Sequence, residues 1–386
     1  MPNGRAASAA AAPRLTRLSL RDFRCYEEAE LHFPAGVTLV VGANAQGKTS
    51  LLEAVAWAAT GSSFRGVPDA VLVRAGCDSA IVRAEVVDGA RAQLLEAEIR
   101  ASGRNRVRLN DHPLTKARER RELVRVTVFA PDDLQLVKGG PAERRAYLDG
   151  LLTSVAPRYE AVIADYDRVL RQRNALLKQR FGSDPDDETT MKVFDAQLAR
   201  TGAELTRGRW RMLERLVPLV AEAYDELAHQ PDAVDAGYQS EWALSGAADA
   251  DADAERDLET ALLEALTARR RAELDRKVTL AGPHRDEWRL RVGGLDARTH
   301  ASQGEQRTLA LALRLGGHRL CTEVIGSAPV LLLDDVFSEL DPQRSAALVA
   351  NLGSGQTLLT TAGDVPDGVR ADHVLRVDAG VVRAAA

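Results

Sequence analysis

Cysteine is scarce in this sequence of 386 residues. Only Cys25, Cys77 and Cys321 occur, far apart and without a Cys-x-x-Cys pair. Zinc fingers and zinc hooks need paired thiolate ligands, so both kinds of metal site are excluded. A sparse and odd set of cysteines is typical of a reducing compartment, so we expect a cytoplasmic protein.

Long apolar runs and an excess of positive charge are also missing. No run approaches the roughly 18 residues that span a bilayer, so we expect no membrane partner. Residues 1–13 are rich in alanine but lack the apolar centre of a signal peptide, and we interpret them as a disordered tail. The net charge of −5 argues against a protein that coats nucleic acid, but not against a local basic stripe.

What is present divides into an α/β part and a helical part. Residues 37–41 form a continuous β-branched run typical of a buried strand, residues 49–60 have the pattern of a helix, and a turn at 102–103 interrupts a β-rich region from 80 to 130. Between 141 and 275 the pattern is helical, with a heptad-like seam from Tyr159 to Leu177. A polar break at 182–188 and a low-complexity loop at 246–255 interrupt the helical pattern. Strand patterns then return at 277–280, 288–292, 330–333 and 357–361.

These patterns predict the domain organisation. The head is formed by residues 14–140 and 276–386, and a helical lobe by residues 141–275 is inserted into it. The lobe should contain a short antiparallel, coiled-coil-like hairpin, because its heptad-like seam is broken once and then resumes.

A phosphate-binding motif follows the buried strand. Gly42-Ala-Asn-Ala-Gln-Gly47-Lys48-Thr49 matches G-x-x-x-x-G-K-[ST] and precedes a helix, as this motif requires. Its backbone N–H groups and the helix N-terminus attract phosphates. We expect Lys48 to reach the β- and γ-phosphates of ATP and the Thr49 hydroxyl to ligate Mg²⁺. The predicted nucleotide-binding residues are Gly42, Ala43, Asn44, Ala45, Gln46, Gly47, Lys48, Thr49 and Ser50.

A second buried strand pattern, Val330-Leu-Leu-Leu, ends in Asp334 and Asp335. An acid at the end of a strand beside the P-loop holds Mg²⁺, a role that fits Asp334. Asp335 is then the candidate general base that polarises the attacking water. Asp335 and Lys48 are the predicted catalytic residues.

Two further motifs resemble those of ABC ATPases. Ser302-Gln-Gly-Glu-Gln306, before an Ala/Leu-rich helix, resembles the signature motif, and Ser338-Glu-Leu-Asp341 resembles the D-loop. In that class the signature of one subunit completes the ATP site of another. The resemblance implies an α/β, ABC-type head with a P-loop sheet and a β-rich subdomain, and an ATP-driven homodimer. The predicted contacts across the dimer are Ser302, Gln303, Gly304, Glu305 and Gln306, with Ser338 and Asp341 in the D-loop.

Other segments are similar to the RecF family over roughly residues 15–365. The opening Leu20-Arg-Asp-Phe-Arg-Cys-Tyr26 resembles L-x-x-F-R-x-Y, and Gly61-Ser-Ser-Phe-Arg65 resembles its S-F-R loop. Further matches are 129–134, 139–149, 171–178 and 279–286. Resemblance to SMC-type heads implies that Arg65 binds the nucleotide and senses the γ-phosphate in the dimer. The alternative is a surface arginine that covers the adenine edge. Asp132 and Asp133 lie where a Q-loop is expected; one could touch Mg²⁺ or water, or cap a helix.

Three features depart from the patterns, of which one is Asp132, which stands where glutamate is frequent. Ala45 stands where many relatives have glycine, and 359–361 lacks the histidine that transporter ATPases place there. The missing histidine suggests slow hydrolysis.

The RecF resemblance implies a weak, DNA-stimulated ATPase that uses ATP and Mg²⁺. ATP would close two heads on duplex DNA near single-strand gaps, and hydrolysis would reopen them. With RecO- and RecR-type partners, the chain would help to load RecA onto gapped DNA, supporting replication restart and the SOS response.

Arg104, Arg106 and Arg108 share one face of a strand and form a candidate stripe for DNA phosphates, with a plain solvated strand as the alternative. The arginine runs at 118–121 and 269–271 are interpreted as solvated helix faces. Three other functions stay open. They are a transporter ATPase subunit, a metabolic P-loop kinase, which needs no signature motif, and a structural SMC-like clamp, which would bind ATP without turnover.

Overall fold

The computed structural model describes residues 12–89, 91–114, 117–178, 187–228, 232–243, 252–353, 355–363, 365 and 367–384. Most of the predicted tail, 1–13, and of the predicted break, 182–188, lies outside these ranges. The chain forms two compact units. Unit 1 comprises Met1–Asp133, Glu226–Gln230 and Cys321–Ala386, and unit 2 comprises Leu134–Asp225 and Pro231–Leu320. The predicted head also contained 134–140 and 276–320, which belong to unit 2.

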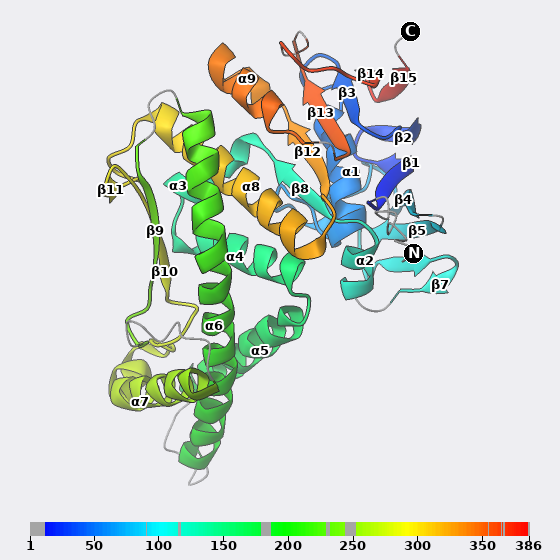
Figure 1. Cartoon of the computed structure of the whole chain (residues 1–386). Helices are drawn as coiled ribbons and strands as arrows, with labels where there is room; N and C mark the ends of the chain where they lie inside the picture. Colours follow the sequence, from blue (N-terminus) through cyan, green and yellow to red (C-terminus); the bar gives the residue numbers. More distant parts are fainter. Residues whose placement is uncertain are drawn as a thin grey trace, which may run out of the picture. The chain divides into compact units, whose positions relative to one another are not determined.

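Unit 1 contains a mainly parallel sheet in the order β15-β14-β3-β13-β12-β8 (Figure 1). Only β15, at one edge, runs antiparallel to its neighbour. The central strands are Val-, Leu- and Thr-rich runs, as expected for strands covered on both faces. The strand bounds are β3 Val37–Val41, β8 Val126–Phe129, β12 Val330–Asp334, β13 Thr357–Thr361, β14 His373–Asp378 and β15 Val381–Ala384.

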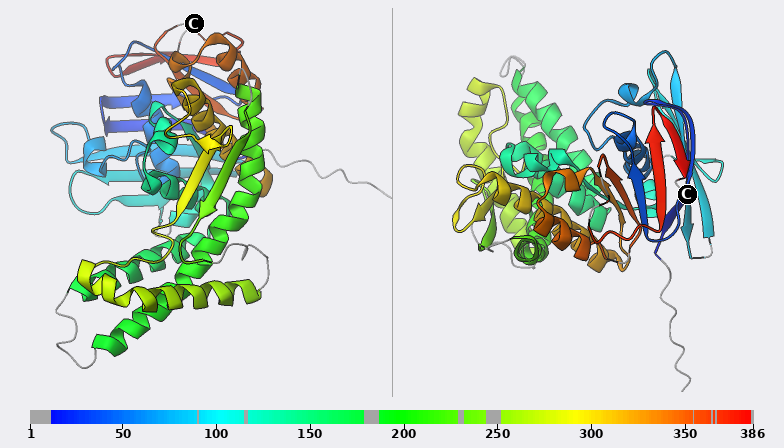
Figure 2. Two further views of the ribbon diagram at one scale, coloured as in Figure 1. Left: turned by 90° about the vertical axis from the view of Figure 1, so that its left-hand side faces the viewer. Right: turned by 90° about the horizontal axis from the view of Figure 1, so that it is seen from above.

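The second sheet of unit 1 is antiparallel, in the order β2-β1-β4-β5-β6-β7. Its strands lie side by side in the left view of Figure 2. Burial alternates along β1 and β4, so one face of the sheet joins the core. The predicted turn at 102–103 is confirmed between β5 and β6. The bounds are β1 Arg14–Phe23, β2 Tyr26–His32, β4 Ser79–Asp88, β5 Arg91–Arg100, β6 Arg106–Leu109 and β7 His112–Pro113.

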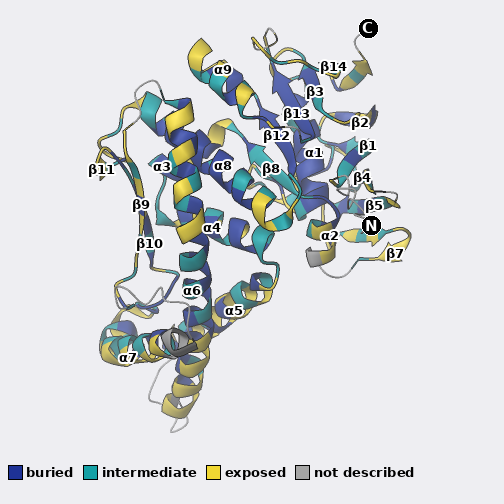
Figure 3. Ribbon diagram, viewed as in Figure 1, coloured by how far each residue is buried: buried dark blue, intermediate teal, exposed yellow. Residues whose placement is uncertain are grey.

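Helix α1 (Lys48–Thr60) packs against strands of both sheets. It is buried on almost every side from Leu51 to Ala59, as Figure 3 shows. A helix that is apolar all round belongs in an interior. The guanidinium carbon of Arg120 lies over the Trp57 ring, 5.0 Å from the ring centroid. Arg120 is therefore buried, and the prediction that it lies on a solvated helix face is wrong. The other elements are α2 Ala117–Leu123, α9 Pro342–Ala350 and the 3₁₀ turns Asp69–Leu72, Pro131–Leu134 and Val336–Glu339.

Unit 2 is built from helices and a small antiparallel sheet, β11-β10-β9. The predicted seam lies on α5 (Tyr159–Lys178), where Tyr159, Tyr166 and Leu177 are buried. The remaining elements are α3 Gln135–Lys138, α4 Pro141–Val155, α6 Asp187–Leu227, β9 Val234–Gln239, α7 Ala252–Arg276, β10 Glu287–Val292, β11 Leu295–Asp296 and α8 Gln303–Ile325. The last residues of α6, from Glu226, and of α8, from Cys321, belong to unit 1.

Two predictions in this region are wrong. Residues 277–280 are not a strand, because side chains take the backbone hydrogen bonds that a neighbouring strand would make. The Asn174 Oδ1 accepts from the Thr279 N–H and the Glu273 Oε1 accepts from the Leu280 N–H, both at 2.8 Å. The predicted loop at 246–255 is also too long: α7 already begins at Ala252, and 246–251 lie outside the described residues.

Candidate nucleotide-binding site

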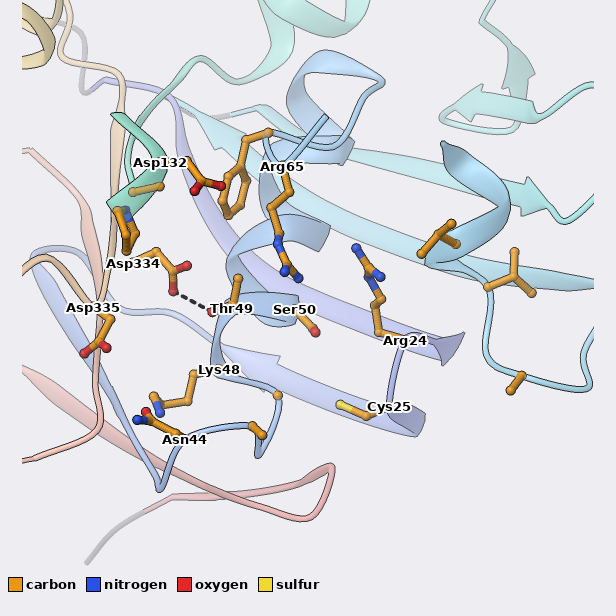
Figure 4. A pocket seen from close by; sticks show the side chains of 18 residues that line it. Arg24, Cys25, Asn44, Lys48, Thr49, Ser50, Arg65, Asp132, Asp334 and Asp335 are labelled. Carbon is orange, nitrogen blue, oxygen red and sulfur yellow. Dashed lines mark hydrogen bonds between the residues drawn. The ribbon is translucent and has the colours of Figure 1, made fainter. Parts of the chain in front are cut away.

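The parallel sheet brings the P-loop and the two acids together. β13 lies between β3 and β12, with Val41 opposite Thr361 and Asp334 opposite Thr360. Because parallel strands end at the same edge, the loop after β3 and the acids after β12 meet there. The Thr49 Oγ1 donates a hydrogen bond of 2.9 Å to the Asp334 Oδ1 (Figure 4), which joins the two motifs.

Glycine is required at two points of the loop. A Cβ at Gly42 would lie 2.3 Å from the Val377 carbonyl oxygen, and one at Gly47, where φ is +116°, would lie 2.6 Å from a cysteine Sγ. Ala45 adopts a left-handed φ of +65° without being glycine. The departure noted in the sequence therefore falls where a side chain is strained.

Lys48 is buried beneath this loop, and its Nζ donates to the carbonyls of Gly42 (2.6 Å) and Ala43 (2.9 Å). Burial lowers the pKa of the Lys48 ammonium, while the carboxylates of Asp335 and Asp334 act in the opposite direction. The cation thus lies at the loop with backbone carbonyls as its hydrogen-bond partners.

A pocket of about 730 Å³ opens beside these residues. It has an acidic side and a basic side (Figure 4), and apolar side chains also line it. Of the predicted residues, the following line it: Asn44, Ala45, Gly47, Lys48, Thr49, Ser50, Arg65, Asp132, Asp334 and Asp335. The apolar side chains among the lining residues are Phe64, Val71, Val73 and Ala75.

Gly42, Ala43 and Gln46 are not among the lining residues. The Gln46 Oε1 accepts from the Ala379 N–H at 2.6 Å, and its carbonyl accepts from the Gly380 N–H at 3.2 Å. Gln46 therefore ties the P-loop to the turn between β14 and β15.

The acidic side depends on Thr360, a residue that the sequence analysis missed. Its Oγ1 donates to the Asp334 Oδ1 and accepts from the Asp335 N–H, both at 2.9 Å. Asp335 has a left-handed φ of +50°, and its Oδ1 is buried without a hydrogen-bond partner among the described residues. A buried acceptor left open at a pocket wall is suited to a ligand or water.

The charge state of Asp334 reflects its surroundings. Burial raises the pKa of this carboxyl, and the hydrogen bonds from Thr49 and Thr360 and the charge of Arg65 oppose that rise. A cation beside the carboxylate would favour its ionised form.

The oxygen atoms at this edge suit Mg²⁺, which binds a few protein oxygens and keeps water and phosphate ligands. Thr49 and Asp334 are the residues that would hold it. Within the described residues there is no cluster of three or more His, Cys, Asp or Glu that could form a complete cage. The two acids and a hydroxyl therefore fit a metal shared with a bound phosphate.

The basic side carries Arg65 and Arg24. Figure 4 shows both guanidinium groups on the same side of the pocket, near Ser50. Arg24 belongs to the RecF-like opening motif, but its position beside the P-loop depends on strand packing, so sequence alone assigns it no role. Asp132 lines the pocket, whereas the Asp133 Oδ2 accepts from the Ala130 N–H at 2.9 Å.

The signature-like segment lies in unit 2, at the start of α8. The Ser302 N–H donates to the Glu305 Oε2 (2.6 Å), and the Glu305 N–H donates to the Ser302 Oγ (3.3 Å), which forms a capping box. Ser302 and Gln303 are exposed, while the Gln306 side chain is buried and donates to the carbonyls of residues 297 and 298. The exposed end of α8 is thus Ser302 and Gln303, and Gly304 and Glu305 are half-buried.

The D-loop-like segment follows Asp335 in unit 1. The Ser338 Oγ donates to the Asp335 carbonyl at 2.7 Å. The Asp341 Oδ1 caps α9 by accepting from the N–H groups of Gln343 (3.1 Å) and Arg344 (3.0 Å). This geometry gives Asp341 a structural role in its own subunit.

Acidic residues on the neighbouring strand oppose the arginine stripe. Glu98 forms an ion pair with Arg106 at 3.5 Å, and Glu96 lies opposite Arg108 in the β5–β6 register. Arg104 is exposed in the preceding loop. The stripe therefore has less free positive charge than its sequence suggests, and its DNA role stays a prediction.

Comparison with known proteins places this arrangement in a family. Residues 14–361 match the model of the RecF/RecN/SMC N terminal domain. The chain is 43% identical to the DNA replication and repair protein RecF of Cutibacterium acnes, over 92% of this chain and 94% of that protein. It is also 43% identical to the protein of that name from Streptomyces avermitilis, over 95% and 99%.

Solved structures agree. A structure of the recombination mediator protein RecF with ATP in the RecFOR pathway superposes with a TM-score of 0.89 at 29% identity, covering 98% of this chain and 100% of that one. The Smc head domain of Pyrococcus furiosus shares the fold, with a TM-score of 0.55 at 17% identity over 97% of this chain and 96% of that one. With its P-loop, paired acids and ABC-type head, the chain belongs to the RecF family.

Proposed function

We propose that this chain is an ATP-dependent DNA-binding protein of recombinational repair that acts as a mediator with RecO- and RecR-type partners in the cytoplasm. The observation that carries the proposal is the Thr49–Asp334 hydrogen bond, which joins the P-loop to the acids in a pocket with an arginine side. The names of its relatives, and a solved structure of RecF with ATP, support it.

The pocket accounts for binding and hydrolysis of ATP. The Lys48 ammonium can leave its two backbone carbonyls for the phosphates, and Thr49 and Asp334 would hold Mg²⁺. Bound Mg²⁺ neutralises developing charge on the phosphates. Asp335, with one open carboxylate oxygen, is placed to accept a proton from the attacking water. The apolar side chains that line the pocket offer a surface for the base.

The exposed N-terminus of α8 gives the basis for a dimer. Its Ser302 end presents backbone N–H groups, which attract a phosphate from another subunit. ATP would then join two heads on duplex DNA near a gap, and slow, DNA-stimulated hydrolysis would separate them. In this role the dimer would help to load RecA and support replication restart and the SOS response.

Ser302→Arg tests this proposal. A large cation at the α8 N-terminus should block the contact between subunits while leaving the P-loop of the same chain intact. The monomer is expected to bind a non-hydrolysable ATP analogue within about twofold of wild type, because Ser302 and the P-loop lie in different units. It should fail to dimerise, hydrolyse ATP or hold DNA. Calorimetry measures the first property, and light scattering measures the mass.

Ala175→Arg, at an exposed position on α5, is the matched control for the added charge, and it should dimerise normally. ATP-dependent dimers of the Ser302 variant would contradict the signature assignment. Wild-type chain that stays monomeric with ATP and duplex DNA would contradict the clamp itself, whereas a P-loop kinase would turn over a small substrate without dimerising.

A further inference from the structure

Glu53 is a carboxylate within an otherwise apolar helix. It lies on α1 one turn after Thr49 and is fully buried, as are its neighbours from Leu51 to Ala59. Burying a carboxylate is costly unless it is paired and hydrogen-bonded. The hydrogen-bond partners of the Glu53 carboxylate therefore indicate the role of this side chain.

Arg24 is the first partner. It lies in the turn between β1 and β2 with a left-handed φ of +54°. Its Nε and Nη2 donate to the two carboxylate oxygens of Glu53, both at 2.8 Å. Such a bidentate pair fixes the plane of the guanidinium group. Arg24 also lines the pocket, where its guanidinium lies beside that of Arg65 (Figure 4).

Ser63 is the second partner. This buried hydroxyl donates a short hydrogen bond to the Glu53 Oε1 and accepts from the Arg65 N–H at 3.1 Å. One carboxylate therefore holds the side chain of Arg24 and, through Ser63, the backbone of the loop that carries Arg65. One of these loops precedes α1 in sequence and the other follows it, and Glu53 bonds to both.

We propose that Glu53 is a positioning residue of the nucleotide site, which holds Arg24 and the Arg65 loop so that both guanidinium groups face the phosphates of a bound nucleotide. The inference rests on the proposed ATP-binding function. It gives Arg24 a direct contact with the nucleotide, while Glu53 acts only through its partners.

Glu53→Gln tests the inference. The amide keeps the size and can still accept from Ser63, but it loses the charge and one of the two arginine contacts. ATP affinity should fall about tenfold, because a hydrogen bond to a charged group contributes on that order. The KM for ATP should rise more than kcat falls, since binding rather than proton transfer is affected. Arg24→Gln should weaken binding at least as much, and adding Glu53→Gln to it should change the affinity by less than about twofold.

Glu287→Gln is the matched control. It weakens a comparable pair in unit 2, in which Arg144 donates to the Glu287 Oε1 at 3.0 and 2.6 Å. This control should lose stability in urea but bind ATP as wild type does.

If wild type binds ATP and both Glu53→Gln and Arg24→Gln bind it equally well, the positioning role is refuted and Glu53 is only structural. A wild-type chain that binds no ATP refutes the proposed function instead. Should Glu53→Gln not fold, Arg24→Gln and Ser63→Ala carry the test, and wild-type affinity in both overturns the proposal.

Discussion

The nucleotide pocket of unit 1 and the interior of unit 2 both bury charged side chains, but they satisfy them differently. In unit 2, Arg173 is fully buried and donates to Asp195 (2.9 Å), Glu273 (2.5 Å) and Thr279 (2.8 Å). In the pocket, Lys48 has only two backbone carbonyls as hydrogen-bond partners, and one oxygen of Asp335 has none among the described residues.

The difference separates structural charges from functional ones. A buried charge whose partners all belong to the fold stabilises that fold, whereas one left partly open at a cavity wall is suited to a ligand. The RecF-like motif at 139–149 contains charges of the first kind: its Arg144 binds Glu287, and its Asp149 forms a bidentate pair with Arg209 at 2.8 Å. Resemblance alone did not distinguish these from the P-loop residues.

Lys48→Arg should have the largest effect. The planar guanidinium cannot replace a compact ammonium that fits between two carbonyls at 2.6 and 2.9 Å. We expect calorimetry to show ATP binding weakened by about 100-fold or more, on the order of two charge-assisted hydrogen bonds. Lys178→Arg, at the exposed end of α5, is the control and should bind normally. Normal ATP turnover by the Lys48 variant would contradict the assignment of residues 42–49 as a P-loop.

Asp335→Asn should lower the rate of hydrolysis by about 10²–10⁴-fold, the usual contribution of a general base. Because Asp334 still holds its position through Thr49 and Thr360, ATP binding should persist and the ATP-bound dimer should accumulate. Single-turnover phosphate release measures the rate, and light scattering measures the dimer. An unchanged rate would move the role to Asp132, which lines the pocket, rather than to Asp133, which is bonded to the backbone.

Arg173→Met should act on stability instead. It leaves Glu273 buried without its cation and Asp195 with Arg270 as its remaining cation, which costs about 3–5 kcal/mol of unfolding free energy. Urea unfolding measures this loss, and the folded fraction should bind ATP as wild type does. Neutralising the acids as well, with Asp195→Asn and Glu273→Gln, should recover part of the lost unfolding free energy. A large loss of ATP affinity in the folded variant would contradict the distinction between the two regions.

Lowering the pH should reduce the stability of unit 2 through His284. Its buried ring is hydrogen-bonded through Nδ1 to the Tyr166 hydroxyl (2.6 Å) and through Nε2 to the Thr279 carbonyl (3.2 Å). Burial lowers the pKa of His284 to about 4. An unfolded histidine has a pKa of about 6.5, so below that pH the unfolded state binds a proton that the folded state does not. The stability that the fold has above pH 6.5 is therefore lost as the pH falls toward 4. Between pH 7 and pH 5 the loss is about 2 kcal/mol.

His284→Asn, which keeps an acceptor for Tyr166, should remove that part of the pH dependence. The neighbouring Asp286 has its pKa raised by burial to about 6, which favours the folded state in acid. Because Asp286 is present in both proteins, the difference between wild type and variant isolates His284. Parallel urea curves at pH 7 and pH 5 measure it, and identical pH dependence would exclude His284 as the titrating group.

The smallest expected effect is at Ala45. Glycine adopts a left-handed φ of +65° without the strain of a Cβ, so Ala45→Gly should raise the unfolding free energy by about 1 kcal/mol or less. Ala43→Gly, at a neighbouring position without a positive φ, should be neutral or destabilising. Thermal unfolding compares the two, and equal shifts would mean that strain at Ala45 is absent.

Local pattern sufficed for much of the head. The P-loop, the acids after β12 and the helix after β3 were predictable because their chemistry depends on residues adjacent in sequence, and the strand pattern at 330–333 predicted β12 within one residue. Helix α5 was predictable too, since its apolar spacing is a property of the segment itself.

Only the tertiary structure decided which other side chains complete the site. Thr360 reaches Asp334 because β13 lies between β3 and β12, an order that differs from the order along the chain. Arg24 and Glu53 meet because α1 packs against the β1–β2 sheet. The stretch 277–280 failed as a strand for the same reason, since side chains distant in sequence bind its backbone. Short-range sequence pattern carries the periodicity of an element, but contacts between distant segments arise only when the chain folds.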